Sequence, residues 1–312
     1  MTRSKTIFLS LISLMLAGWL CNGCERNNRA EVDKSRLVIV TTTGIIRDAV
    51  INLVHNRAVV VALMGPGVDP HLYKATQGDL DKLLEADLVV YNGLHLEGKM
   101  SDVLEKLSHR KPVYALGHSL PDSLLNRISG YENTYDPHIW FDVSLWSMAV
   151  GNLAAYLQEF DPANATFYKN NYLVYAAKLD SLHNWVKQEI NSIPDNQRVL
   201  ITAHDAFGYF GKAYNIEVRG LQGISTLSEF GLRDISDLAR FIQERKIKAV
   251  FVETSVPEKS IRSLITGCRE RGWDVQLGGS LYSDALGAEG TPEGTYIGMV
   301  KSNVSTIVKA LR

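Results

Sequence analysis

Short runs of β-branched and apolar residues alternate with segments of helical periodicity along most of the chain. This alternation is typical of βα units, which build a parallel sheet covered by helices. In the first half the pattern predicts strands at Leu37–Val40, Ala58–Leu63, Leu88–Tyr91 and Pro112–Ala115. It predicts helices at Ile45–Leu53, Gln77–Leu84 and Ser144–Phe160.

A long run of helix-compatible residues interrupts the alternation in the middle of the chain. Asp161 and Pro162 supply signals for a helix start, and Pro194 ends the run after Ile193. A helix of this length extends roughly 45 Å, which is more than one small domain needs. We interpret residues 161–193 as a rigid connector between two lobes. A helix packed wholly within one domain is the alternative.

The alternation resumes after Asp195. It predicts strands at Arg198–Thr202, Glu217–Leu221, Ala249–Val252 and Asp274–Leu277, and helices at Phe207–Tyr214, Ile235–Arg245, Glu258–Arg271 and Tyr296–Leu311. The expected fold is therefore α/β. It has two similar lobes, each with a mostly parallel sheet flanked by helices, joined by one long connecting helix. The expected division is 36–160, 161–193 and 195–312.

The first 24 residues differ from the rest of the chain. Arg3 and Lys5 precede an uncharged apolar run, Thr6–Leu20, as in a secretory signal. A membrane anchor is the alternative, but the run is shorter than the roughly 20 residues that a spanning helix needs. Cys21 or Cys24 stands where a lipoprotein would carry its lipid. We therefore expect an exported protein, either periplasmic or anchored on the extracytoplasmic side of the membrane.

Composition narrows the classes of function. The chain has 33 basic and 34 acidic residues, so its net charge of −1 gives no reason to expect a nucleic-acid partner. A hydrophobic content of 46% with 21% charged residues is ordinary for a globular protein. Beyond the signal only Cys268 remains, which excludes a disulfide framework and a thiolate metal site. We expect a monomer without a protein substrate.

Three histidines and one aspartate share a revealing context. His71 and His204 each follow a predicted strand, as does Asp284, while His138 repeats the Asp-Pro-His element of His71. Ligands of open α/β sheets bind beyond the carboxyl ends of the strands, and the proline stiffens the turn that presents the imidazole.

Taken singly, each of these histidines is more often a structural residue than a ligand. Together, three imidazoles and a carboxylate suit one four-coordinate divalent ion. The separations along the chain (71 to 138, 138 to 204 and 204 to 284) are far too long for a local zinc finger. They require a site between the lobes.

Four segments carry a resemblance to a known family. In order, they are GVDPHLYKAT, DPHIWFDV, TAHDAFGYF and LYSDALG. They resemble the ligand segments of the zinc- and manganese-type (cluster A-I) solute-binding proteins of ABC importers, and the similarity spans essentially all of residues 36–312. The resemblance implies two α/β lobes on one long helix. It also implies an ABC permease and its ATPase subunit as partners.

Carried over segment by segment, the resemblance implies His71 and His138 from the first lobe and His204 and Asp284 from the second as the metal ligands. Treponemal-type receptors of this family combine three histidines with the aspartate.

Manganese-type members tend to have glutamate where this chain has His204, and imidazole suits zinc better than manganese. Many zinc-type members carry a histidine-rich loop. The corresponding region here, residues 117–135, has one histidine, His118. We expect one divalent transition metal per chain, with Zn²⁺ favoured, Mn²⁺ next and iron third.

Two further residues are weaker candidates. His95 follows the strand that ends at Tyr91 and is expected to line the cleft; the alternative is a residue just outside the ligands or in solvent. Glu253 follows the strand Ala249–Val252 and is expected to accept a hydrogen bond from a ligand histidine.

An enzyme is not expected, because the sequence has no HExxH and no GxSxG element and therefore offers no catalytic residue. The alternatives are an exported zinc-dependent hydrolase and a metal-linked adhesion lipoprotein.

Overall fold

The computed structural model describes residues 36–128 and 133–312. Leu37–Arg312 form one compact unit. The predicted export signal, with Cys21 and Cys24, lies outside the described residues. Among the residues that are described, no helix is both long and apolar enough to cross a membrane.

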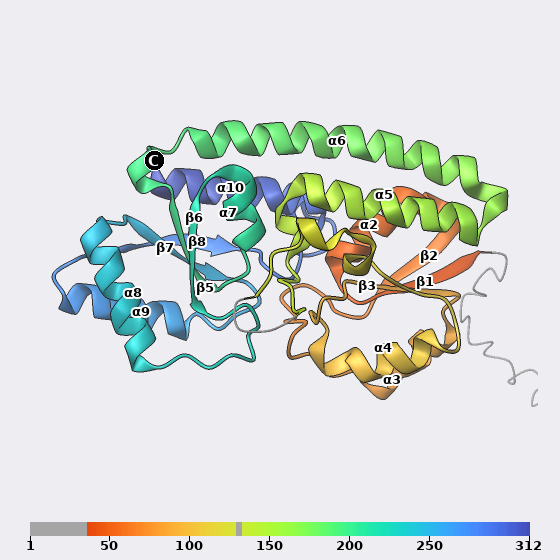
Figure 1. The fold of residues 1–312 in the computed structure, drawn as a ribbon, viewed down its shortest axis with the longest axis horizontal. Coiled ribbons are helices and arrows are strands. Elements are labelled where there is room, and N and C mark those ends of the chain that lie inside the picture. The colour runs from red at the N-terminus through yellow and green to blue at the C-terminus, as the bar shows by residue number, and fades with distance from the viewer. Residues whose placement is uncertain (1–35, 129–132) are drawn as a thin grey trace, which may run out of the picture. The chain divides into compact units, whose positions relative to one another are not determined.

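A parallel sheet with strand order β2-β1-β3-β4 organises the first half of the unit (Figure 1). Its strands are β1 (Leu37–Thr41), β2 (Ala58–Ala62), β3 (Leu88–Tyr91) and β4 (Val113–Ala115). All four lie at the predicted positions. Because every pair is parallel, the carboxyl ends of these strands point to one edge of the sheet.

Helices cover both faces of this sheet, and the alternation of strand side chains explains why. Leu88 and Val90 of β3 belong to the apolar cluster that includes α2 (Gly44–Val54) and α5 (Val143–Phe160). Val89, between them, packs with α3 (Gln77–Glu85) and α4 (Ser101–Ser108) on the other side. Helix α4 was not among the predicted helices.

One long helix, α6 (Ala165–Asn191), links the first half to the second (Figure 1). Its 27 residues extend about 40 Å. It begins later than predicted, because Pro162–Asn164 form a separate 3₁₀ turn that the Ala165 amide closes by donating to the Pro162 carbonyl. The helix packs against α2 and α5 of the first half and against α10 (Tyr296–Leu311) of the second.

The second half contains two parallel strand pairs. One pair is β5 (Val199–His204) with β6 (Glu217–Gln222), and the other is β7 (Ala249–Glu253) with β8 (Gln276–Leu281). Strand β5 lies beside β7. The helices α7 (Gly208–Tyr214), α8 (Leu232–Arg245), α9 (Lys259–Glu270) and α10 flank these strands (Figure 1).

Strand β8 is displaced from its predicted position at Asp274–Leu277. The prediction ended the strand at the glycine pair that follows Leu277, but the strand continues to Leu281, with Gly278 unpaired and Gly279 opposite Phe251. The register shifts between Val250 and Phe251, and Gly279 has a φ of 137° that other residues rarely adopt. A bulge at glycine therefore extends the strand instead of ending it.

A continuous apolar core joins the two halves. It includes side chains of α2, α5, α6, α7 and α10. The rings of Phe141 and Phe207, from different halves, have centroids 4.1 Å apart, and those of Trp146 and Tyr296 lie 5.6 Å apart. We expect this shared core, together with α6, to restrict large relative movement of the halves.

The start of α3 provides a test of local stability. The Thr76 hydroxyl accepts from the Asp79 amide (3.2 Å), and the Asp79 carboxylate accepts from the Thr76 amide (3.0 Å), which is a capping box. Burial raises the pKa of Asp79, but hydrogen bonds from Tyr73 and Thr76 outweigh burial and lower it from 3.8 to about 2. We expect Thr76→Ala to lower the free energy of unfolding by about 1 kcal/mol in urea titrations at pH 7.

The pKa of Asp79 also predicts a pH dependence. Because the folded-state pKa is depressed, the stabilisation by Asp79 is complete above about pH 4 and is lost as the pH falls through about 2. The difference in stability between wild type and Asp79→Asn should therefore shrink across that window. Asp81, exposed on the same helix, is the control, and Asp81→Asn should change stability by less than about 0.5 kcal/mol. Equal effects of the two substitutions would contradict the prediction.

Candidate metal centre

The fold brings the four predicted residues together. His71 lies between β2 and α3, His138 directly precedes the 3₁₀ turn Ile139–Phe141, His204 ends β5, and Asp284 follows β8. All four are buried, with 1% or less of each residue exposed. One potential ligand atom from each lies within 4.8 Å of the others.

The ring nitrogens and the carboxylate converge on one point. His71 Nε2 is 3.4 Å from His138 Nε2. The two oxygens of Asp284 lie 3.4 Å from His138 Nε2 and from His204 Nε2. Nitrogen ligands at 2.0 to 2.1 Å from a tetrahedral zinc ion would be about 3.3 Å apart. The spacing of these atoms therefore suits a small four-coordinate cation.

The two Asp-Pro-His turns have the same local construction. The Asp69 carboxylate accepts from the His71 amide (2.9 Å), and the Asp136 carboxylate accepts from the His138 amide (3.0 Å). Such side-chain turns fix the backbone two residues beyond the aspartate. Asp136 does more, because its Oδ1 is also 2.7 Å from His138 Nδ1. The contact of Asp136 with the His138 ring was not predicted from the sequence.

Glu253 supports His204 in a similar way. It ends β7, next to β5, and its Oε1 accepts from the His204 amide (2.9 Å). Its Oε2 lies 2.5 Å from His204 Nδ1, at a contact distance but without the angle of a good hydrogen bond. A carboxylate on Nδ1 directs Nε2 toward the centre of the cluster.

His71 differs from the other two histidines. Its Nδ1 is buried and has no hydrogen-bond partner among the described residues. No carboxylate therefore fixes the orientation of this ring, whereas Asp136 and Glu253 lie against the rings of His138 and His204.

Charge pairing governs protonation in the cluster. Burial disfavours the charged form of His138, but its contacts with Asp136 and Asp284 outweigh burial and raise its pKa to about 9. For His204, the charges of Glu253 and Asp284 likewise overcome burial and raise the pKa. Burial lowers the pKa of His71 to about 3. Despite burial, the two charged histidines hold the pKa of Asp284 well below its usual range.

A cavity of about 630 Å³ reaches the cluster at His71. Asp205 and His95 also line it. His95 is exposed and lies outside the group of four, in a loop where Gly93, Leu94 and His95 all have positive φ. The buried Glu97 carboxylate secures this loop by accepting from the amides of Asn92 and Gly93. The placement of His95 fits a residue that lines the cleft.

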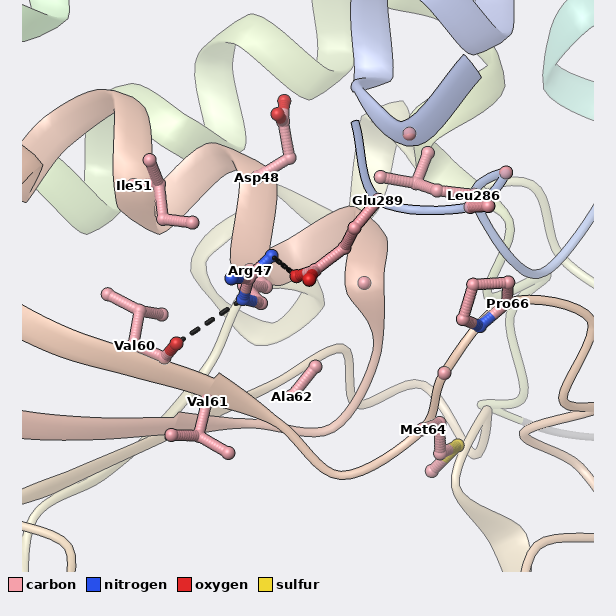
Figure 2. Close-up of a pocket in the computed structure, with 15 residues that line it drawn as sticks. Arg47, Asp48, Ile51, Val60, Val61, Ala62, Met64, Pro66, Leu286 and Glu289 are labelled. Atoms are coloured by element: carbon pink, nitrogen blue, oxygen red, sulfur yellow. Dashed lines mark hydrogen bonds and ion pairs between the residues drawn. The ribbon is translucent and has the colours of Figure 1, made fainter. Parts of the chain in front are cut away.

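Figure 2 shows a different cavity, of about 510 Å³, between α2, β2 and the segment 286–294. Arg47 spans it, with its Nη1 2.6 Å from Glu289 and its Nε donating to the Val60 carbonyl (3.3 Å). None of the four clustered residues lines this cavity. It is therefore separate from the candidate metal centre.

Parallel-sheet halves that share a long helix and enclose a buried cluster of imidazoles define an α/β solute-binding protein for a metal ion. The chain belongs to the family described as "Zinc-uptake complex component A periplasmic", which matches residues 39–310. The resemblance seen in the four sequence segments is thus confirmed.

Individual relatives agree with this family. The chain is 46% identical over 302 residues to the manganese-binding lipoprotein MntA of Bacillus subtilis, across 97% of this chain and 98% of that protein. It is 48% identical over 274 residues to the zinc-binding protein TroA of Treponema pallidum, across 88% of each. The solved structure of periplasmic zinc-binding TroA from Treponema pallidum matches with a TM-score of 0.86 and 47% identity, covering 88% of this chain and 99% of that one.

The turn that carries His204 depends on a close backbone approach. A Cβ on Gly220 of β6 would lie 2.6 Å from the Asp205 Cα and 2.7 Å from the His204 carbonyl carbon. We expect Gly220→Ala to cost about 1 to 3 kcal/mol of stability in urea titrations, because backbone must shift. In Gly267→Ala, the new Cβ would meet Ala239 at an ordinary 3.7 Å, so this control should be neutral or gain up to about 1 kcal/mol. Wild-type stability of Gly220→Ala would refute the close approach.

Proposed function

We propose that this protein is an extracytoplasmic receptor that binds one divalent metal ion at His71, His138, His204 and Asp284 and delivers it to an ABC permease. One observation carries the proposal: four buried donor atoms lie within 4.8 Å of one another. Membership in the zinc-uptake family supports it, as do relatives named for manganese and zinc binding.

Zinc is the metal we favour, with manganese second. The names of the relatives point both ways, since MntA is called manganese-binding and TroA zinc-binding. The donor set supports the choice. Three imidazoles and one carboxylate suit zinc, whereas manganese prefers more oxygen ligands and binds more weakly in the general affinity order.

A receptor fits the cluster better than a hydrolase does. A catalytic zinc ion normally has three protein ligands and keeps a fourth position for water. Here four protein donors face the same point. In the proposed cycle, the ion enters from the cavity at His71, the site closes around it, and the loaded protein docks on the permease, whose ATPase subunit drives release. A lipid on Cys21 or Cys24 would hold the receptor at the membrane.

The test is metal stoichiometry. The mature chain, purified without added chelator, should contain about one metal ion per molecule by mass spectrometry, and in competition titrations zinc should displace manganese. Ala substitution of His138, His204 or Asp284 should abolish stoichiometric binding, because each removes one of four donors. His109→Ala, at the exposed end of α4, is the control and should retain it. Full metal content in the Asp284→Ala protein would overturn the proposed ligand set.

Glu253 offers a finer test. If it orients His204, Glu253→Gln should lower zinc affinity about 10- to 100-fold, because the neutral amide holds the ring less firmly. Asp161→Asn is a matched change in a half-buried carboxylate that accepts from Tyr168 at the far end of α5, and it should leave zinc affinity unchanged. Unaltered zinc affinity in the Glu253→Gln protein would remove Glu253 from the proposed site.

A further inference from the structure

Trp140 joins the segments that carry two of the proposed ligands. It lies two residues after His138 and is 2% exposed. Its indole Nε1 donates to the main-chain carbonyl of Ser283 (3.0 Å), the residue before Asp284. The partners of this bond are 143 residues apart in the chain.

The bond closes a small ring around the metal centre. From His138 the chain runs through Ile139 to Trp140, crosses the hydrogen bond to Ser283, and continues to Asp284. The ring closes where Asp284 Oδ1 lies 3.4 Å from His138 Nε2. Because the indole is rigid and buried, the length of this bond limits how far His138 and Asp284 can separate.

Both ends of the bond are anchored elsewhere. The Trp140 carbonyl accepts from the Tyr296 hydroxyl (2.7 Å) at the start of α10. Asn303, further along α10, holds the main chain of Tyr282 through both its amide and its carbonyl. The indole therefore links two segments that α10 also contacts, through a bond that joins the residue two positions after His138 to the residue directly before Asp284.

The carboxylate of Asp284 has a second contact, with Ser255, which follows β7. The hydroxyls of Ser255 and Ser283 lie 2.8 Å apart, and Ser255 Oγ is 3.5 Å from Asp284 Oδ2. Ser255 orients the side chain, whereas Trp140 fixes the main chain before it. The two contacts therefore restrain different parts of Asp284, its side chain and the main chain next to it.

We propose that Trp140 is a positioning residue for the metal ion, and that its indole N–H sets the separation of His138 and Asp284. The inference rests on the proposed metal-binding function and extends it to a residue that does not touch the ion. The bond can form only when the two ligand segments are together, so metal loading and the bond strengthen each other. Packing against the His138 ring, whose centroid is 5.3 Å away, is a separate contribution that a ring without the N–H would keep.

The experiment removes the donor and preserves the ring. Trp140 is replaced by Phe and, in a second protein, by β-(3-benzothienyl)alanine, which keeps the bicyclic shape and lacks the N–H. Zinc affinity is measured by competition titration with a chelator. We expect about a tenfold loss of affinity with either replacement, because removal of an outer contact typically has this effect.

The chain offers a matched control. Trp273 also donates its indole N–H to a main-chain carbonyl, that of Ile247 (2.8 Å), and it does not line the cavity at the metal centre. The same two replacements at Trp273 should leave zinc affinity within about twofold of wild type. A loss of similar size at both positions would show a general effect of removing an indole bond and would overturn the proposal.

A second measurement needs no substitution. In ¹⁵N-tryptophan-labelled protein, exchange of the Trp140 indole proton should slow at least about tenfold when zinc is added, while that of Trp273 stays the same. Wild-type zinc affinity in the benzothienyl protein, or unchanged Trp140 exchange on loading, would overturn the positioning role. Failure of the unaltered protein to bind zinc or manganese would instead overturn the proposed function, so the two failures are distinguishable.

Discussion

Pairing between buried imidazoles and carboxylates is the interaction on which the centre depends. Burial alone would keep the imidazoles neutral and protonate the carboxylates. Instead, Asp136 and Glu253 lie against the outer nitrogens of His138 and His204, and Asp284 lies between their inner nitrogens. This alternation of charge allows four inward-facing polar groups to remain buried without an isolated charge, which would cost several kcal/mol. A divalent cation bound at the proposed site would supply positive charge to the same carboxylates.

The parallel strands explain how residues so distant in sequence reach one place. Strands β5 and β7 lie side by side, so the residues that end them, His204 and Glu253, become neighbours. His71 and Asp284 follow the strands β2 and β8 and approach the same point from other directions. The shared core and α6 pack the two halves against each other. The relative positions of the donor atoms therefore depend on packing that lies far from them.

Local features could be predicted from the sequence, and contacts across the fold could not. The Asp-Pro-His turns and the strand before His204 are local signals that led to the three histidines, and the segment LYSDALG after the last predicted strand led to Asp284. Glu253 was found because it ends a strand. The double contact of Asp136 with His138 has no periodic signal.

The bond from Trp140 to Ser283 is harder still, because it joins residues 143 positions apart and looks like ordinary packing in the sequence. The error at β8 has a similar origin. The glycine pair after Leu277 carries a bulge that only pairing with β7 specifies.

The four clustered side chains are not held equally firmly by their neighbours, and this difference matters for a receptor that must both bind and release its ion. A fully rigid site would bind a cation tightly and release it slowly, since affinity within one site is set mainly by the dissociation rate. His138, His204 and Asp284 are each held by a partner outside the cluster. His71 lacks one at Nδ1 among the described residues and faces the cavity. In the proposed site, the least restrained donor thus lies on the accessible side, which suits entry of an ion past His71 while the other three donors keep their positions.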